Sequence, residues 1–326
     1  MNDLPELLSK AAELAAASLA PSTRASYASD LRAFARFSLS RGLVCLPAEP
    51  GTVAAWIAHA SESLAPSSIV RSLVSIGRAH TLAGFPDPTK SDDVRAVRAG
   101  LLRLTRGRAS NKATPIYFED LKRMVAKTDC SMNGIRDAAL LALGWACGAR
   151  RSEIVALDTT DIEETQNGIL VTFRQTKTGI SRSVGIPVIP GIDLDFCALI
   201  QKWLARYGAP GPLFPSFGKL GRWFFAESRS RLQPRAVRDI VARYAHRAGL
   251  VGNYTGHSLR RGLISESARR GVPAWAIQRV TGHVTVDQLY DYIGPSRAFV
   301  DSPLNALRDE PEPFVSRKDR LLPSLE

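Results

Sequence analysis

The sequence has few cysteines and no apolar run long enough to cross a bilayer. Its four cysteines are widely spaced without a C-x-x-C pair, which indicates neither a disulfide framework nor a zinc ribbon and favours a reducing, cytoplasmic compartment. The longest apolar run, residues 138–148, is typical of a buried helix. Asp3 and Glu6 precede no apolar core, so the start of the chain does not resemble a signal peptide. We therefore expect a globular protein without a membrane partner.

Acidic residues are outnumbered by basic ones, which points to a polyanionic partner. The 326 residues carry a formal net charge of +12 and a pI near 9.9, and most of the basic residues are arginine. Phosphate contacts dominate nucleic-acid affinity, and the arginine fork binds phosphate oxygens in pairs. From charge alone, a solvated basic surface is the alternative. The length predicts about two domains.

Periodic apolar residues predict a mainly helical chain of the α+β class, with one small β-hairpin. The first hundred residues lack strand-like alternation and predict a helical bundle, with Ser22 and Ser67 near helix starts. The helices expected there span residues 4–18, 22–41, 52–62, 67–82 and 91–105. A polar, basic stretch over residues 106–115 is typical of an interdomain linker. A linker this basic, with Lys112, is suited to cross a DNA backbone, and a solvated tether is the alternative.

The second region contains the only predicted strands. Residues 169–174 and 182–187 are β-prone runs on either side of a turn with Gly179, which places Lys177 near the tip of a hairpin. Helices are expected over residues 118–127, 134–147, 193–207, 234–248, 257–269, 274–281 and 286–293, with a short one at 299–307.

The second region also lacks a metal-binding pattern. It has no carboxylate cluster of the two-metal kind and no His/Cys ligand spacing, so arginines would have to neutralise a reacting phosphate. Arg150 and Arg260 are the candidates, and His257 lies one helical turn before Arg260. Lys177 would supply a proton to the leaving group, because no other lysine occurs between Lys127 and Lys202.

Two tyrosines near the end of the chain are candidate nucleophiles. Tyr292 follows His283 by nine positions, and Tyr290 is the alternative. The run from Gly211 to Lys219 departs from the phosphate-loop pattern, because its glycines are too far apart and no Ser or Thr follows the lysine. No metal, nucleotide or other cofactor is therefore expected.

The order and spacing of these residues resemble the tyrosine recombinases of the phage integrase family. The resemblance covers about Leu19 to Leu307, selects Tyr292 over Tyr290, and is strongest to short phage recombinases without an arm-binding domain. It implies an enzyme that cleaves and rejoins DNA through a 3′-phosphotyrosyl link, with Glu153 as a buttress of the first arginine. The implied catalytic set is Arg150, Glu153, Lys177, His257, Arg260, His283 and Tyr292.

The resemblance also implies how the chain would hold DNA and assemble. It divides the chain into a core-binding domain (1–105), the linker (106–115), a catalytic domain (116–298) and a tail exchanged between subunits (299–326). The implied partner is double-stranded DNA with inverted-repeat half-sites in the bacterial nucleoid, bound by a protein that is monomeric in solution and tetrameric on two paired sites. The expected DNA contacts are Arg24, Ser26, Arg71, Arg78, Lys112, Arg235 and Arg238.

Two alternative functions use the same scaffold. One is a non-catalytic DNA-binding protein, which the complete set of six active-site residues, Glu153 not counted, disfavours. The other is a type IB topoisomerase or telomere resolvase, which has the same chemistry without strand exchange between sites; the short architecture and the tail disfavour it.

Overall fold

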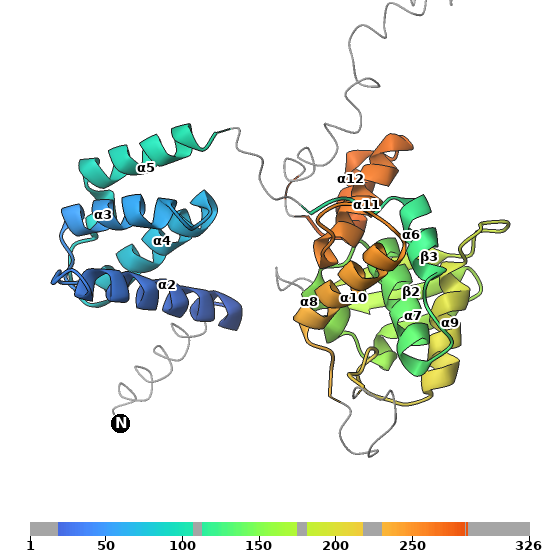
Figure 1. Ribbon diagram of the computed structural model, residues 1–326. Coiled ribbons are helices and arrows are strands. Elements are labelled where there is room, and N and C mark those ends of the chain that lie inside the picture. The colour runs from blue at the N-terminus through green and yellow to red at the C-terminus, as the bar shows by residue number, and fades with distance from the viewer. Residues whose placement is uncertain (1–18, 107–112, 175–180, 218–229, 284, 286–326) are drawn as a thin grey trace, which may run out of the picture. The chain divides into compact units, whose positions relative to one another are not determined.

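The computed structural model describes residues 19–106, 113–174, 181–217, 230–283 and 285, and the chain divides into two compact units. The division falls between Ser110 and Asn111, inside the stretch expected to be a linker. In Figure 1 the described part of the first unit consists of helices, and the second unit combines helices with a small sheet. The mainly helical fold with a small sheet, predicted from the sequence, is confirmed.

Four α-helices and one short 3₁₀ helix form the first unit over its described residues. They are α2 (Pro21–Leu39), α3 (Pro50–Ser61), α4 (Pro66–Leu82), η1 (Pro88–Lys90) and α5 (Asp92–Leu104). Trp56 lies at the centre of the core, with its ring centroid 6.0 Å from Phe34 and 5.4 Å from Phe37 in edge-to-face geometry. The expected helix over residues 4–18 lies outside the described residues.

Three of these helices begin at a proline, and not at the serines predicted near their starts. Pro21, Pro50 and Pro66 occupy the first turn, and the residues before them make no side-chain cap. Proline is suited to this position because its φ is already helical and its missing N–H would have had no partner there. The two helices therefore begin within one residue of their predicted starts, but Ser22 and Ser67 do not cap them.

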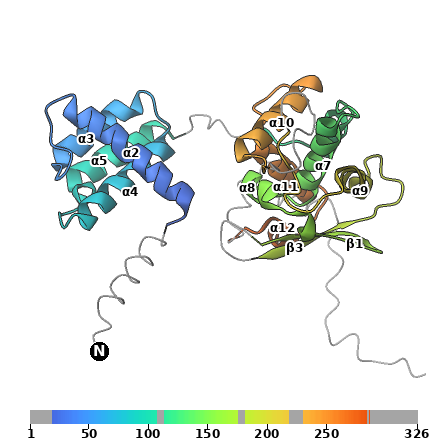
Figure 2. The same ribbon diagram turned by 90° about the horizontal axis from the view of Figure 1, so that it is seen from below.

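The second unit packs its helices on one side of a three-stranded antiparallel sheet. Its elements are α6 (Phe118–Val125), α7 (Met132–Ala146), α8 (Arg151–Ala156), η2 (Thr159–Asp161), β1 (Ile162–Thr165), β2 (Gly168–Phe173), β3 (Arg182–Pro187), α9 (Phe196–Tyr207), α10 (Pro234–Arg247), α11 (Gly256–Arg269) and α12 (Ala274–Thr281). Figure 2 shows the sheet along one edge of this unit, with α7, α9 and α10 on the same side of it. Among the described residues, no helix is long and apolar enough to span a membrane.

The predicted hairpin is present, and a strand that the sequence did not indicate extends it. β2 pairs with β3 in a register that places Phe173 opposite Arg182, and β1 pairs along the other side of β2. β1 has the sequence Ile-Glu-Glu-Thr, which is mostly exposed and too short for a clear alternation. Residues 175–180, which include Lys177, lie outside the described residues.

Helix α11 packs closely on the segment that opens the second unit. The backbone N–H of Ile116 donates to the Ser258 carbonyl at 3.1 Å, and Trp145 Nε1 donates to the Ile116 carbonyl at 2.8 Å. A Cβ on Gly262 would lie 1.7 Å from that carbonyl oxygen, so only glycine allows this approach. Thr114 also bonds to the Asn253 carbonyl at 2.8 Å, which anchors the end of the expected linker to this unit. These contacts fix the helix that carries His257 and Arg260.

Candidate active site

The first element of the site is the short turn between α7 and α8, which presents Arg150. Arg150 stands just before α8, and its backbone N–H donates to Oε2 of Glu153 at 2.9 Å. Arg150 Nη1 also donates to Oε1 of the same carboxylate at 2.6 Å. Glu153 therefore caps the start of α8 and at the same time holds the side chain of Arg150 in place, as expected for a residue that supports the first arginine.

Glu153 is shared with a second arginine that the sequence did not single out. Arg182 Nη2 donates to Glu153 Oε2 at 2.7 Å, and Glu153 itself is 1% exposed. Burial alone would raise the pKa of Glu153, but the hydrogen bond from the Arg150 backbone and the charges of Arg182 and Arg150 outweigh it and lower the pKa. The carboxylate is therefore ionised between two guanidinium groups.

Arg260 is buried, and neutral acceptors hold its guanidinium. It is 1% exposed, and Nη1 donates to the carbonyl oxygens of Gly148 at 2.9 Å and Thr281 at 2.6 Å. Gly148 has φ +54°, and a Cβ there would lie 2.9 Å from Leu263 and Thr281 side chains. Glycine thus lets the turn after α7 aim a carbonyl at Arg260. These contacts satisfy N–H groups without removing the positive charge.

The C-terminal end of α12 faces three arginines with three consecutive carbonyl groups. Arg182 Nη1 donates to Val280, Arg260 Nη1 to Thr281 at 2.6 Å, and Arg150 Nη2 to Gly282 in a longer contact of 3.4 Å. Carbonyls at a helix C-terminus have no partner inside the helix and carry its negative partial charge. One helix end therefore aligns three cations, and Gly282, in the left-handed conformation at φ +65°, ends the helix there.

His283 follows directly and is held as a neutral imidazole. Arg260 Nη2 lies 2.9 Å from His283 Nε2, and a guanidinium can only donate, so Nε2 is the acceptor. The proton is then on Nδ1, which donates to Thr281 Oγ1 at 2.7 Å, and that hydroxyl donates to the Ile277 carbonyl at 2.7 Å. Burial and the charge of Arg260 lower the pKa of His283 to about 3.

His257 occupies the first turn of α11, one turn before Arg260. Its N–H donates to Thr255 Oγ1 at 3.2 Å, the residue that caps the helix. The His257 residue is exposed overall, but atoms packed around its ring withdraw it from water, and with the charges of Arg260 and Arg261 this lowers its pKa. At neutral pH the arginines therefore carry the positive charge of the site.

The structure thus brings together most, but not all, of the catalytic residues expected from the sequence. Arg150, Glu153, Arg260 and His283 are joined by hydrogen bonds, directly or through the end of α12, and His257 lies on the same helix as Arg260. Lys177 and Tyr292, like Tyr290, lie outside the described residues. Their expected roles stay predictions. Within the part of the chain that the structure describes, no cluster of His, Cys, Asp and Glu could hold a metal ion.

The residues expected to contact DNA lie on exposed helix surfaces where they are described. Arg24 is exposed on α2, and Ser26 there donates to the Ser22 carbonyl at 2.9 Å. Arg78 is exposed on α4, where Arg71 forms a two-bond ion pair with Asp30 at 2.8 and 2.9 Å. On α10, both expected arginines lie within 4 Å of Asp239, at 3.9 Å for Arg235 and 2.8 Å for Arg238. Lys112 lies outside the described residues.

Sequence reasoning missed Arg182 and the end of α12. Arg182 begins a strand, and a single arginine in a β-prone run has no spacing that marks it as part of a site. The carbonyls of Val280 to Gly282 have no sequence signature either, although the helix expected over residues 274–281 does end at this point. Contacts across the fold, from α8 to β3 and α12, reveal both.

Comparisons with known proteins assign the chain to a family. A model of the phage integrase family matches residues 115–297. The chain belongs to the phage integrase family.

Relatives and solved structures support this assignment over most of the chain. An integrase/recombinase XerD homolog of Selenomonas ruminantium is 29% identical over 89% of this chain and 86% of its own length. The recombinase Cre of Escherichia phage P1 is 25% identical over 76% of each chain, so it is one of several relatives at similar distance. The crystal structure of a lambda integrase dimer bound to a COC′ core site shares the fold, with a TM-score of 0.61, 17% identity, and coverage of 89% of this chain and 77% of that chain. The protein is accordingly a tyrosine recombinase, an enzyme that cleaves and rejoins DNA.

The pKa of His283 gives a first prediction, on stability against pH. An unfolded histidine titrates near pH 6.5, whereas folded His283 binds its proton only near pH 3, so the unfolded chain binds more protons between these values. Stability from this residue is therefore complete above about pH 6.5 and is lost as the pH falls toward 3. We expect His283→Gln to flatten the decline of the melting temperature between about pH 6.5 and 4.5.

The matched control is His59→Gln, which removes an exposed histidine from the first unit. Melting curves of the three proteins at the same ionic strength isolate the contribution of His283. An unchanged slope in His283→Gln would mean that the folded imidazole takes up its proton at an ordinary pH.

Proposed function

We propose that this tyrosine recombinase is site-specific and breaks one DNA strand at a time by attack of Tyr292 on a phosphate. The bond from phosphorus to the departing 5′ oxygen breaks as the tyrosine oxygen bonds to phosphorus, which leaves a 3′-phosphotyrosyl link. A 5′-hydroxyl of a partner strand then attacks that link and restores the tyrosine. Because the covalent link keeps the bond energy, the cycle needs no nucleotide cofactor.

The observation that carries the proposal is the set of three arginines aligned at the end of α12. Arg150 is held by Glu153, and Arg260 is held by carbonyls and His283, so both guanidinium groups are fixed before substrate arrives. Preorganised cations of this kind stabilise the charge that grows on a five-coordinate phosphorus. Removal of one comparable donor costs about 2.7–4 kcal/mol of transition-state stabilisation. Tyr292 follows His283 by nine residues, within reach of the same end of α12 along the chain.

In this mechanism the other residues have separate roles. Neutral His257 and His283 orient the phosphate and Arg260 without adding charge of their own, in keeping with their lowered pKa values. Lys177 donates the proton that the departing 5′ oxygen needs. Arg24, Ser26, Arg71, Arg78, Lys112, Arg235 and Arg238 bind the duplex, with Arg235 placed to contact a guanine edge from the first turn of α10. The work takes place in the cytoplasm, on DNA of the nucleoid.

Removal of the proposed nucleophile gives the decisive test. We expect Tyr292→Phe to bind its site as tightly as the wild type and to form no covalent adduct, because the ring remains and the reacting oxygen is gone. The measurement is a nicked suicide duplex separated on a denaturing gel.

Tyr290→Phe is the matched control for this test, because the same oxygen is removed two residues away. Its adduct should form at the rate of the wild type. An adduct that persists in Tyr292→Phe and disappears in Tyr290→Phe would assign the nucleophile to Tyr290.

The proton donor can be tested by changing the leaving atom. In a duplex whose departing 5′ oxygen is replaced by sulfur, the thiolate leaves without a proton, so a general acid is unnecessary. We expect Lys177→Ala to be strongly impaired on ordinary DNA and close to the wild type on the sulfur-containing duplex. Equal impairment on both would show that Lys177 acts on charge or structure instead.

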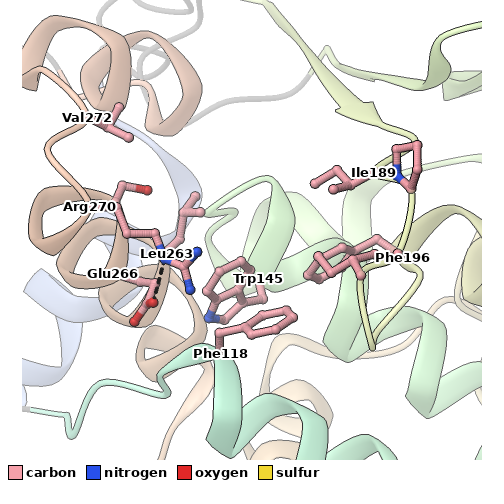
Figure 3. A pocket seen from close by; sticks show the side chains of 12 residues that line it. Phe118, Trp145, Ile189, Phe196, Leu263, Glu266, Arg270 and Val272 are labelled. Atoms are coloured by element: carbon pink, nitrogen blue, oxygen red, sulfur yellow. Dashed lines mark hydrogen bonds and ion pairs between the residues drawn. The ribbon is translucent and has the colours of Figure 1, made fainter.

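We also propose that four subunits assemble on two paired sites through their C-terminal tails. The supporting feature is an apolar pocket of about 470 Å³ between α6, α7, α9 and the second half of α11 (Figure 3). Trp145 and Phe196 stack at its base with ring centroids 5.7 Å apart, and an ion pair from Glu266 to Arg270 lies at its edge at 2.8 Å. The tail contains apolar residues at helical spacing that suit such a pocket: Phe299, Val300, Leu304 and Leu307.

A charge placed in this pocket should block assembly without harming the fold. Ile189 and Val272 line the pocket and are 47% and 37% exposed, so Ile189→Asp and Val272→Asp leave the core intact. Both variants should bind one half-site normally but lose cooperative binding and recombination on a full site. A truncation after Arg297 should behave in the same way.

Val251→Asp is the control, because Val251 is 96% exposed in the same unit and does not line the pocket. Gel-shift titrations on half-sites and full sites compare these proteins. Full cooperativity in the pocket variants would mean that the tail docks elsewhere, for example on its own subunit.

A further inference from the structure

Arg182 connects three parts of the site, although none of the expected roles includes it. It is the first residue of β3, and its guanidinium carbon lies 4.3 Å from the ring centroid of Phe173, its partner across the sheet. From there the guanidinium donates to Glu153 Oε2 at 2.7 Å and to the Val280 carbonyl. The loop end of the hairpin, the carboxylate that holds Arg150 and the end of α12 thus meet at one side chain.

The surroundings of Arg182 are shaped around its side chain. A Cβ on Gly282 would lie 3.1 Å from Arg182 Cδ and Nε, so the glycine that ends α12 also leaves room for the arginine. The Arg182 side chain is only 11% exposed, so most of it is enclosed by protein. Both terminal nitrogens of its guanidinium donate to protein groups, as expected for a residue that acts through its neighbours.

The contacts of Arg182 determine what its loss would change. Glu153 holds Arg150 by two hydrogen bonds, and Arg182 shares the same carboxylate, so the position of Arg150 depends on both. Arg182 also holds Val280, one residue before the Thr281 carbonyl that binds Arg260 and three before His283. Without its guanidinium, Arg150 and Arg260 would no longer be fixed relative to each other.

We propose that Arg182 is a positioning residue for DNA cleavage, which aligns Arg150 and Arg260 by fixing Glu153 and the end of α12. This inference rests on the proposed function of the site. Because its contacts are with groups that hold the charge-stabilising arginines, its loss should slow the step that builds negative charge on phosphorus. A substrate whose leaving group needs no proton should therefore not restore the cleavage rate.

The experiment compares single-turnover cleavage by Arg182→Gln, Arg182→Lys and the wild type on a suicide duplex. At saturating DNA we expect Arg182→Gln to cleave roughly 10- to 100-fold more slowly, the range typical when residues that orient the ligands of a catalytic centre are removed. Binding affinity should stay within about twofold of the wild type. Arg182→Lys should fall between them, since an ammonium keeps the charge but cannot span both acceptors in the fork geometry.

Two further readouts separate positioning from a merely structural role. The sulfur-containing duplex should leave the defect of Arg182→Gln unchanged, in contrast to that of Lys177→Ala. In a double-mutant cycle with Glu153→Gln, the two losses should be far from additive, because both residues act on Arg150 through one contact. Additive losses, or a sulfur-dependent recovery, would overturn the inference.

Arg174 provides the matched control, because it directly follows Phe173 at the same end of the hairpin but pairs with Asp161 at 2.9 Å, outside the site. Arg174→Gln should cleave like the wild type.

A lowered melting temperature of Arg182→Gln would make its slower cleavage ambiguous, and the Arg182→Lys variant then provides the test. Cleavage at the wild-type rate by a stable Arg182→Lys variant overturns the proposal. The absence of an adduct with the wild type would contradict the proposed function itself. Normal cleavage by the Arg182 variants would contradict only the role of Arg182.

Discussion

The active site depends on one constraint: several arginines must be held close together and partly out of water without losing their positive charge. A carboxylate for each would satisfy the hydrogen bonds but cancel the charge that a phosphate needs. The protein instead uses one shared carboxylate, Glu153, and a series of carbonyl groups. Carbonyl oxygens at helix ends are suitable acceptors, since they carry negative partial charge and lack partners within the helix. Arg150, Arg182 and Arg260 therefore remain cationic in a fixed arrangement.

This arrangement requires backbone to approach side chains closely, and three glycines make that possible. Gly148 turns the chain after α7 so that its carbonyl faces Arg260, and Gly282 ends α12 beside Arg182. Gly262 lets α11 approach the carbonyl of Ile116, which fixes the helix that carries Arg260. The consequence for chemistry is that the cations need little rearrangement when charge develops, which is the basis of electrostatic preorganisation.

The sequence predicted the parts of the site better than their connections. The helices, the β2–β3 hairpin and the residues Arg150, His257, Arg260 and His283 follow from periodicity and from short motifs, because both are local properties of the chain. The role of Glu153 followed from the resemblance to the family. Arg182 acts through contacts with residues far away in the sequence, and a sequence pattern contains no information about such contacts. The short strand β1 was missed for a related reason, since its pairing with β2 gives it an extended form that its own residues do not indicate.

The arginines on the helix surfaces differ physically from those of the site, and the difference matches two separate tasks. Arg235 and Arg238 are 81% and 44% exposed and pair with Asp239, itself 49% exposed, and such surface pairs contribute at most about 1 kcal/mol. A DNA phosphate can replace this carboxylate at little cost, so binding through these residues should weaken with rising salt as counterions compete. The guanidinium of Arg260 is 1% exposed and is held by groups that no phosphate displaces. Affinity and catalysis can therefore vary independently in this protein, because exchangeable surface pairs serve binding and the fixed arginines at the end of α12 serve the reaction.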